Sequence, residues 1–204
     1  MIYEVRTYTL KPGSVAEFEK RFGEALPYRE EYSKLGAFWH TEFGPLNQVI
    51  HVWPYEDLNE RVQIRAEAAK DTHWPPKVQE FIVNMESEVM IPAPFMRPLG
   101  HQHLGNIYEM RIYTYQSGAI PEVIKRWSVA VPYREKYSPL AACWYSDLGG
   151  LNRWFHVWPY KDMADRDRVR TEASKDSHWP AQTREFMIRQ ENKLLVPAAF
   201  SPMH

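Results

Sequence analysis

Ile2-Tyr3-Glu4-Val5-Arg6-Thr7-Tyr8-Thr9 returns as Ile107-Tyr108-Glu109-Met110-Arg111-Ile112-Tyr113-Thr114, and this pair of stretches decides the fold. The same offset, 105 positions from Ile2 to Ile107, carries Pro27-Tyr28-Arg29-Glu30 onto Pro132-Tyr133-Arg134-Glu135 without a gap. Roughly half of the aligned positions are identical, and self-similarity of this extent indicates a tandem duplication. The chain is therefore two copies of one module.

The two copies are separated by a stretch that carries no hydrophobic periodicity. Residues 98–106 contain Pro98, Gly100 and Gly105, and this punctuation is typical of a linker. The predicted organisation is a first module over residues 1–97, a linker over 98–106 and a second module over 107–204.

Each copy has the pattern of six consecutive elements. In the first copy we expect a strand over 3–10, a helix after the turn at 11–13, a hairpin of strands over 37–43 and 48–53, a second helix from Asp57 to the region of 71–75, and a strand over 84–91. The order β-α-β-β-α-β is the ferredoxin-like arrangement of an α+β protein.

A sheet with both helices on one face leaves its other face uncovered. In a soluble protein that face needs a partner, and the second copy can supply it. We therefore predict two ferredoxin-like modules whose sheets pack face to face as an intramolecular pseudo-dimeric α/β barrel, with the helices outside.

The repeated residues also resemble a known family. The run from Tyr3 to Gly13, the strand His51-Val52-Trp53 and the ending Pro92-Ala93-Pro94-Phe95 are similar to those of the NIPSNAP domain, once in each copy. The resemblance implies the dimeric α/β barrel superfamily, which includes cofactorless monooxygenases, isomerases and haem-binding relatives. For the NIPSNAP branch it implies no established reaction.

Charge and cysteine content narrow the class of partner. Lys plus Arg (25) and Asp plus Glu (26) nearly cancel, so neither nucleic acid nor a membrane is an expected partner. The single cysteine, Cys143, and the lack of an export signal at the N-terminus predict a cytoplasmic location. Further homo-oligomerisation of the pseudo-dimer stays open.

Pro27 and Pro132 mark the first candidate site, because a proline inside a helix removes a backbone hydrogen bond and is expected to break the helix there. The break would aim the following residues at a pocket between helix and sheet. There Tyr28 and Tyr133 are candidate catalytic residues, and Arg29 and Arg134 are candidates for binding a carboxylate or enolate. Alternatively, these side chains form surface ion pairs and cover the helix end.

The central hairpin carries the second candidate set. His51 and Trp53 share one strand face, and His156 and Trp158 repeat the pattern. Both histidines are candidate general acids or bases, and the candidate substrate-binding tryptophans are Trp39, Trp144, Trp53 and Trp158. The alternative is that the histidines are satisfied residues of an interface.

Other polar residues have structural interpretations. Glu4, Arg6 and Tyr8 share a strand face, and we expect a Glu–Arg network in the seam between the sheets; the alternative is a substrate site. The resemblance implies haem-binding relatives, and only by that analogy are His73 and His178 conceivable haem ligands. We expect them to cap a helix instead. The sequence predicts no metal and no cofactor.

The leading interpretation is a protein that binds a small aromatic or polyketide-like ligand in one helix/sheet pocket per repeat. Cofactorless monooxygenase and isomerase are the activities that the resemblance suggests. The alternative is a non-enzymatic interaction or scaffold module, in which the same aromatic residues only fill a core. Whether the protein is an enzyme stays open at this point.

Overall fold

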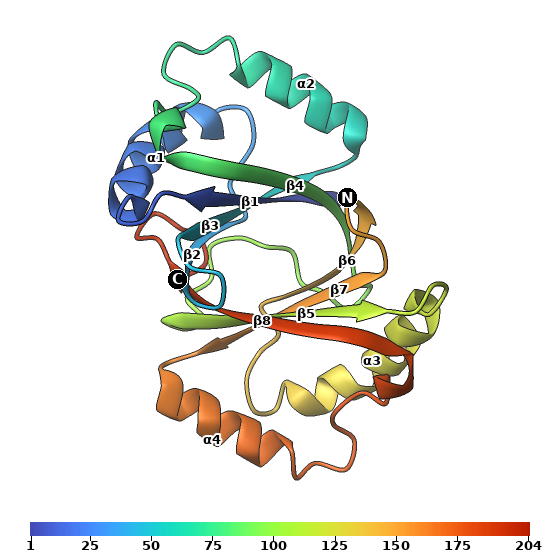
Figure 1. The fold of residues 1–204 in the computed structure, drawn as a ribbon. Coiled ribbons are helices and arrows are strands. Elements are labelled where there is room, and N and C mark those ends of the chain that lie inside the picture. The colour runs from blue at the N-terminus through green and yellow to red at the C-terminus, as the bar shows by residue number, and fades with distance from the viewer.

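The computed structural model describes residues 1–204, and its two halves have the same order of elements (Figure 1). The first half contains β1 (Ile2–Leu10), α1 (Val15–Glu30), β2 (Ala37–Phe43), β3 (Gln48–Tyr55), α2 (Leu58–Ala68), the 3-10 turn η1 (Gln79–Phe81) and β4 (Ile82–Pro92). The second contains β5 (Ile107–Tyr115), α3 (Ile120–Arg134), β6 (Ala142–Leu148), β7 (Arg153–Tyr160), α4 (Met163–Ala173), the turn η2 (Arg184–Phe186) and β8 (Met187–Pro197). The predicted β-α-β-β-α-β order is confirmed in both.

The eight strands form one closed barrel in the order β1-β3-β2-β8-β5-β7-β6-β4, and every pairing is antiparallel. The two four-stranded sheets join where Val89–Pro92 of β4 pairs with β6 and where Leu194–Pro197 of β8 pairs with β2. Closure leaves no free sheet edge, and a free edge is the part of a sheet most prone to pair with another chain. This is the predicted pseudo-dimeric α/β barrel.

The way in which the modules meet differs from the expectation. The sheets were expected to pack face to face, but they are also hydrogen-bonded edge to edge. β4 runs from Ile82 to Pro92 and exceeds the expected 84–91 at both ends, where Ile82 pairs with Leu10 of β1 and Pro92 with Trp144 of β6. Its last residues find their hydrogen-bond partners in the other half of the chain, and no local sequence pattern records such a partner.

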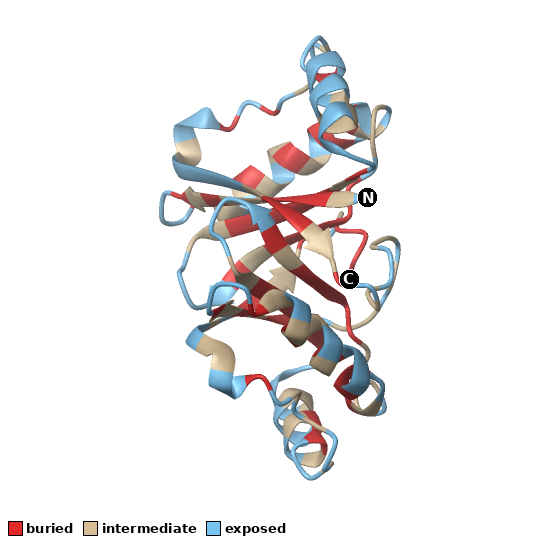
Figure 2. Ribbon diagram, turned by 90° about the vertical axis from the view of Figure 1, so that its right-hand side faces the viewer, coloured by how far each residue is buried: buried red, intermediate tan, exposed pale blue.

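The barrel separates an inner core from two outer cores. Side chains of both modules fill the interior, where Tyr3 stacks on Trp144 with ring centroids 5.8 Å apart. The other face of each sheet is covered by the helices of its own module, which lie on opposite sides of the barrel (Figure 1). Burial is accordingly concentrated in the strands and on the inward faces of α1 and α3 (Figure 2).

Two local predictions concern the helices. Helix α1 continues through Pro27 to Glu30, so the expected break does not occur. Pro27 costs one hydrogen bond near the end of the helix, and the last turn still forms beyond it. The start of α2 is as predicted, because the Asp57 side chain accepts a hydrogen bond from the Glu60 amide at 2.9 Å.

The segment 98–106 crosses from the first module to the second at the barrel. Leu99 and Leu104 pack against the inner core, and the Gln102 amide donates to the Pro202 carbonyl at 2.9 Å. The link between the modules and the C-terminal residues therefore lie side by side.

No helix of the chain is long and apolar enough to span a membrane.

Candidate functional site

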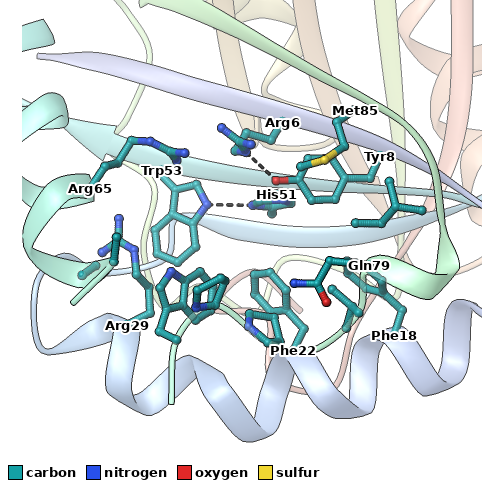
Figure 3. A pocket seen from close by; sticks show the side chains of 17 residues that line it. Arg6, Tyr8, Phe18, Phe22, Arg29, His51, Trp53, Arg65, Gln79 and Met85 are labelled. Carbon is teal, nitrogen blue, oxygen red and sulfur yellow. Dashed lines mark hydrogen bonds between the residues drawn. The ribbon is translucent and has the colours of Figure 1, made fainter. Parts of the chain in front are cut away.

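The candidate site of the first module is a cavity of about 280 Å³ between the outer face of the sheet and the helices (Figure 3). β1 and β3 form its floor through Arg6, Tyr8, His51 and Trp53, and α1, α2 and the loop after α2 enclose it. Small-molecule sites usually measure about 300–1,000 Å³, so this cavity lies just below the lower limit of that range.

The cavity wall is positively charged. Three arginines line it, Arg6, Arg29 and Arg65, and no carboxylate does. Glu4 does not line the cavity; it is fully buried and accepts hydrogen bonds from Arg6 and Arg61, each at 2.7 Å. One carboxylate therefore serves several guanidinium groups, and the wall keeps an excess of positive charge.

Glu4 is ionised despite its burial. Burial alone would raise the pKa of Glu4, but the hydrogen bond from Arg61, the charges of Arg65 and Arg6 and the Ser87 hydroxyl at 2.7 Å outweigh it and lower the pKa to about 2. The network holds Arg6 and Arg65 in place from behind. It lies between the sheet and α2, so the expected position in the seam between the two sheets is wrong.

Arg29 is a buried cation without an acidic partner. The residue is 3% exposed, and its guanidinium donates to the Ser33 hydroxyl at 2.9 Å and to the Tyr55 hydroxyl at 3.0 Å. It also lies over the Trp53 ring, 4.4 Å from the centroid. Burial lowers the pKa of Arg29, although the Tyr55 hydroxyl opposes this. A buried cation that contacts only neutral groups is well placed to bind an anion.

The tautomer of His51 follows from one hydrogen bond. The Trp53 indole N–H, which can only donate, points at His51 Nδ1 at 2.7 Å (Figure 3). Nδ1 must therefore be unprotonated, and the proton of the neutral ring is on Nε2. Burial, followed by the charge of Arg6, lowers the pKa of His51 to about 3, so the ring is neutral at pH 7.

His51 Nε2 is buried and has no hydrogen-bond partner in the protein. A buried N–H without a partner is costly, and the ring that carries this one is part of the cavity wall. The ring is thus arranged to donate a hydrogen bond from Nε2. It is poorly arranged to act as a general base, because Trp53 already occupies the nitrogen that could accept a proton.

The second module repeats this geometry. Trp158 donates to His156 Nδ1 at 2.7 Å, and His156 Nε2 is again buried without a partner. Arg134 donates to the Tyr160 hydroxyl at 3.1 Å and lies 4.2 Å from the Trp158 ring centroid. Burial and the charge of Arg111 hold the pKa of His156 well below its usual value. The structure thus brings the predicted Arg, His and Trp residues together in both halves.

The other predicted residues lie elsewhere. Trp39 and Trp144 are in the barrel interior with no exposed surface, on the opposite face of the sheet from the cavities, so neither indole can reach a ligand there. Tyr28 lies outside the cavity and stacks on His73, with centroids 4.2 Å apart; Tyr133 stacks on His178 at 4.0 Å. These stacks attach the loop after α2 to helix α1, and the loop after α4 to helix α3.

Several residues of the site were not predicted from the sequence. Arg65 reaches the cavity from α2, and the loop that follows adds Trp74, Pro75 and Val78. A signal for the arginine existed, since the spacing of Arg61 and Arg65 is repeated by Arg166 and Arg170 on a helix with few apolar residues. The loop carries no periodic pattern, and only its position over the sheet makes it part of the site. No cluster of three or more potential metal ligands occurs in the chain.

Comparison with known proteins agrees with the fold and the duplication. Protein NipSnap homolog 3A of Homo sapiens is 28% identical over 100% of this chain and 86% of its own length. The Protein NipSnap homolog of Dictyostelium discoideum is 29% identical over 96% of this chain and 87% of its own. The solved structure of a proposed monooxygenase from Lactobacillus acidophilus aligns over 97% of this chain and 94% of its own with a TM-score of 0.66, at 11% identity, which shows a shared fold. The NIPSNAP family model matches residues 3–97 and again residues 108–202, and the chain therefore belongs to the NIPSNAP family.

Proposed function

We propose that this protein binds a small aromatic or polyketide-like anion in the cavity between sheet and helices, with a carboxylate or enolate oxygen held by the arginines and by His51 Nε2. The observation that carries the proposal is the pairing of a buried cation without an acidic partner, Arg29, with a buried N–H donor without any partner. Aromatic walls from Trp53 and Phe22 suit a flat apolar body.

The same groups suit the reactions expected from the resemblance. Cofactorless oxygenation and isomerisation both pass through an enolate, and positive groups fixed around the developing oxyanion lower its energy. No carboxylate lines the cavity, and Nδ1 of His51 is engaged by Trp53. The proton acceptor for such a reaction would have to be the substrate, water or a residue outside the lining. Binding is therefore the core of the proposal, and catalysis is its extension.

A reducing compartment such as the cytoplasm belongs to the same proposal. Its support is the single cysteine, Cys143, which is buried and unpaired. The near balance of charges supports a small ligand over nucleic acid or a membrane surface.

The binding proposal is tested by calorimetry at pH 7 with 2-naphthoate and with its uncharged analogue 2-naphthamide. We expect the amide to bind at least about tenfold more weakly, because it leaves the buried cations unneutralised. Arg65→Gln should weaken 2-naphthoate binding by about fivefold, since it removes a partly exposed charge worth about 1 kcal/mol.

Lys70→Gln is the matched control, because Lys70 follows the same helix, is exposed and pairs only with Glu67. It removes the same charge without touching the cavity. Failure of both probes to bind the wild-type protein at millimolar concentration would overturn the proposal and favour an interaction module. Equal affinity for acid and amide would overturn the role of the charges.

A further inference from the structure

One hydroxyl in the cavity of the first module has a proton that no protein atom accepts. Tyr8 lines this cavity, and its hydroxyl accepts a hydrogen bond from Arg6 Nε at 2.7 Å (Figure 3). The hydroxyl makes no other hydrogen bond within the protein. A phenol has one proton to donate as well as lone pairs that accept, so Arg6 satisfies only the acceptor side of Tyr8. The donor side is left for a ligand or for water.

A chain of hydrogen bonds holds this hydroxyl from behind. Arg6 donates from Nη1 to the buried carboxylate of Glu4 at 2.7 Å and from Nε to Tyr8, so its guanidinium is fixed between the two. Burial raises the pKa of Tyr8, although Arg6 opposes this, and the hydroxyl is therefore protonated at pH 7. Tyr8 is thus a fixed hydrogen-bond donor with an unused proton.

His51 lies next to Tyr8 and carries a second unused proton. The two rings meet edge to face with their centroids 4.9 Å apart, and His51 Nε2 has no partner in the protein. Both residues belong to the wall of the same cavity, where the charged side chains are all arginines. Fixed donors and cations together stabilise negative charge on oxygen, so this part of the wall favours an oxyanion.

The second module repeats the arrangement. The Tyr113 hydroxyl accepts from Arg111 Nε at 2.8 Å, and Tyr113 lines a cavity together with His156, whose ring centroid is 4.8 Å from its own. The residue opposite the tyrosine on the neighbouring strand differs, since Met85 pairs with Tyr8 and Gln190 with Tyr113. The two sites therefore have the Tyr, Arg and His residues in common although other positions around them differ.

We infer that Tyr8 and Tyr113 are ligand-binding residues, each of which donates its O–H, beside the N–H of the neighbouring histidine, to a phenolate or enolate oxygen of the ligand. Such an oxygen is more basic than a carboxylate oxygen, and a hydrogen bond strengthens with the basicity of its acceptor. This inference rests on the proposed function. It adds a donor to the site and narrows the ligand from a carboxylate or enolate to the more basic class of oxyanion.

The test uses 4-nitrophenol, which reports its own ionisation because the phenolate absorbs at longer wavelength than the phenol. Absorbance titrations across pH compare the free probe with the probe bound to the wild-type chain. Binding should lower the pH at which the probe is half ionised, with its proton released to water, because the site stabilises the anion. Tyr8→Phe removes one hydrogen bond to a charged oxygen, so the first module should bind the phenolate at least about tenfold more weakly.

The repeat supplies a second variant. Tyr113→Phe should have the same effect on the second module, and the two substitutions together should affect both sites. For the probe bound to the double variant, the pH of half ionisation should be higher than in the wild type by about one pH unit, which corresponds to the tenfold loss of phenolate affinity. A merely structural role of the tyrosines would not change the ionisation of a bound probe.

Tyr28→Phe and Tyr55→Phe are the matched controls. Tyr28 lies outside the cavity, so its substitution should leave the titration unchanged. The Tyr55 hydroxyl also accepts from an arginine, Arg29 at 3.0 Å, but does not line the cavity. If Tyr8 acted only by holding an arginine in place, Tyr55→Phe would weaken phenolate binding as much as Tyr8→Phe does, and this result would overturn the inference.

Thermal melting followed by circular dichroism establishes that each variant is folded, and Tyr113→Phe carries the test if Tyr8→Phe is not. Unchanged phenolate affinity in a folded variant would overturn the inference and leave the proposed function standing, as would binding of 2-naphthoate without any binding of 4-nitrophenol. Absence of binding by both probes would overturn the proposed function itself.

Discussion

Glu4→Gln is expected to change stability and ligand affinity in opposite directions. Glu4 is fully buried and holds Arg6 and Arg61 at 2.7 Å each, so the substitution leaves these guanidinium groups facing one another without a counter-charge. A pKa lowered from 4.5 to about 2 corresponds to about 3 kcal/mol of stability at pH 7. Removal of one partner from a buried ion pair costs a similar amount, about 3–5 kcal/mol.

The measurement is urea unfolding followed by circular dichroism for both proteins. We expect the variant to be less stable by about 3 kcal/mol at pH 7. Because folding lowers the pKa of Glu4, the stability that Glu4 contributes to the folded protein is present above pH 4.5 and is lost as the pH falls from 4.5 towards 2. At pH 4 the difference between the proteins should therefore be smaller by about 1 kcal/mol.

The binding measurement should move the other way. Without Glu4 the wall of the cavity gains positive charge, and 2-naphthoate should bind more tightly to the variant while 2-naphthamide does not. Glu109→Gln is the matched variant of the second module, where Arg166 contacts Glu109 at 2.7 Å. A loss of stability below about 1 kcal/mol, typical of an exposed pair, would refute the reasoning, as would a loss that does not depend on pH.

Three further predictions concern other parts of the molecule. Folding lowers the pKa of His51 to about 3, so its contribution to the free energy of unfolding is complete above pH 6.5 and is lost as the pH falls towards 3. In urea titrations the free energy of unfolding should therefore drop by about 2 kcal/mol between pH 7 and pH 5, and His156 should add to the drop. An unchanged value would contradict this assignment. Trp39→Ala should cost about 3–5 kcal/mol by the same titration and leave 2-naphthoate affinity unchanged, whereas weaker binding would place Trp39 in the site. Asp57→Ala and Asp162→Ala should each cost about 1 kcal/mol as lost helix caps, and the prediction fails if the unfolding midpoints do not move.

Part of the candidate site was predictable because its residues belong to repeated, periodic strands. His51 and Trp53 lie two positions apart on β3, so their common face follows from strand geometry alone. Arg29 was identified through its neighbour Pro27, although the helix does not break there. Which nitrogen of His51 carries the proton was not predictable, because it depends on the rotamer of Trp53.

Trp39 was assigned to ligand binding because its aromatic character is equally compatible with a cavity and with a core. Trp39 faces the barrel interior, where Tyr108 of the other module lies 5.7 Å away. When both faces of a strand are apolar, no sequence pattern distinguishes the face that points into the barrel from the face that points outward. Only closure of the barrel decides which face is which.

The sequence by itself determined the duplication, the order of the elements and the family, because these depend on local periodicity and on the match between residues 105 positions apart, Ile2 and Ile107. The tertiary structure alone decided how the sheets join, which aromatic face becomes the core, and that Arg6, Arg29 and Arg65 share one cavity. These outcomes depend on contacts between residues far apart in the chain. Their energies come from burial and charge in three dimensions, and no local pattern records them.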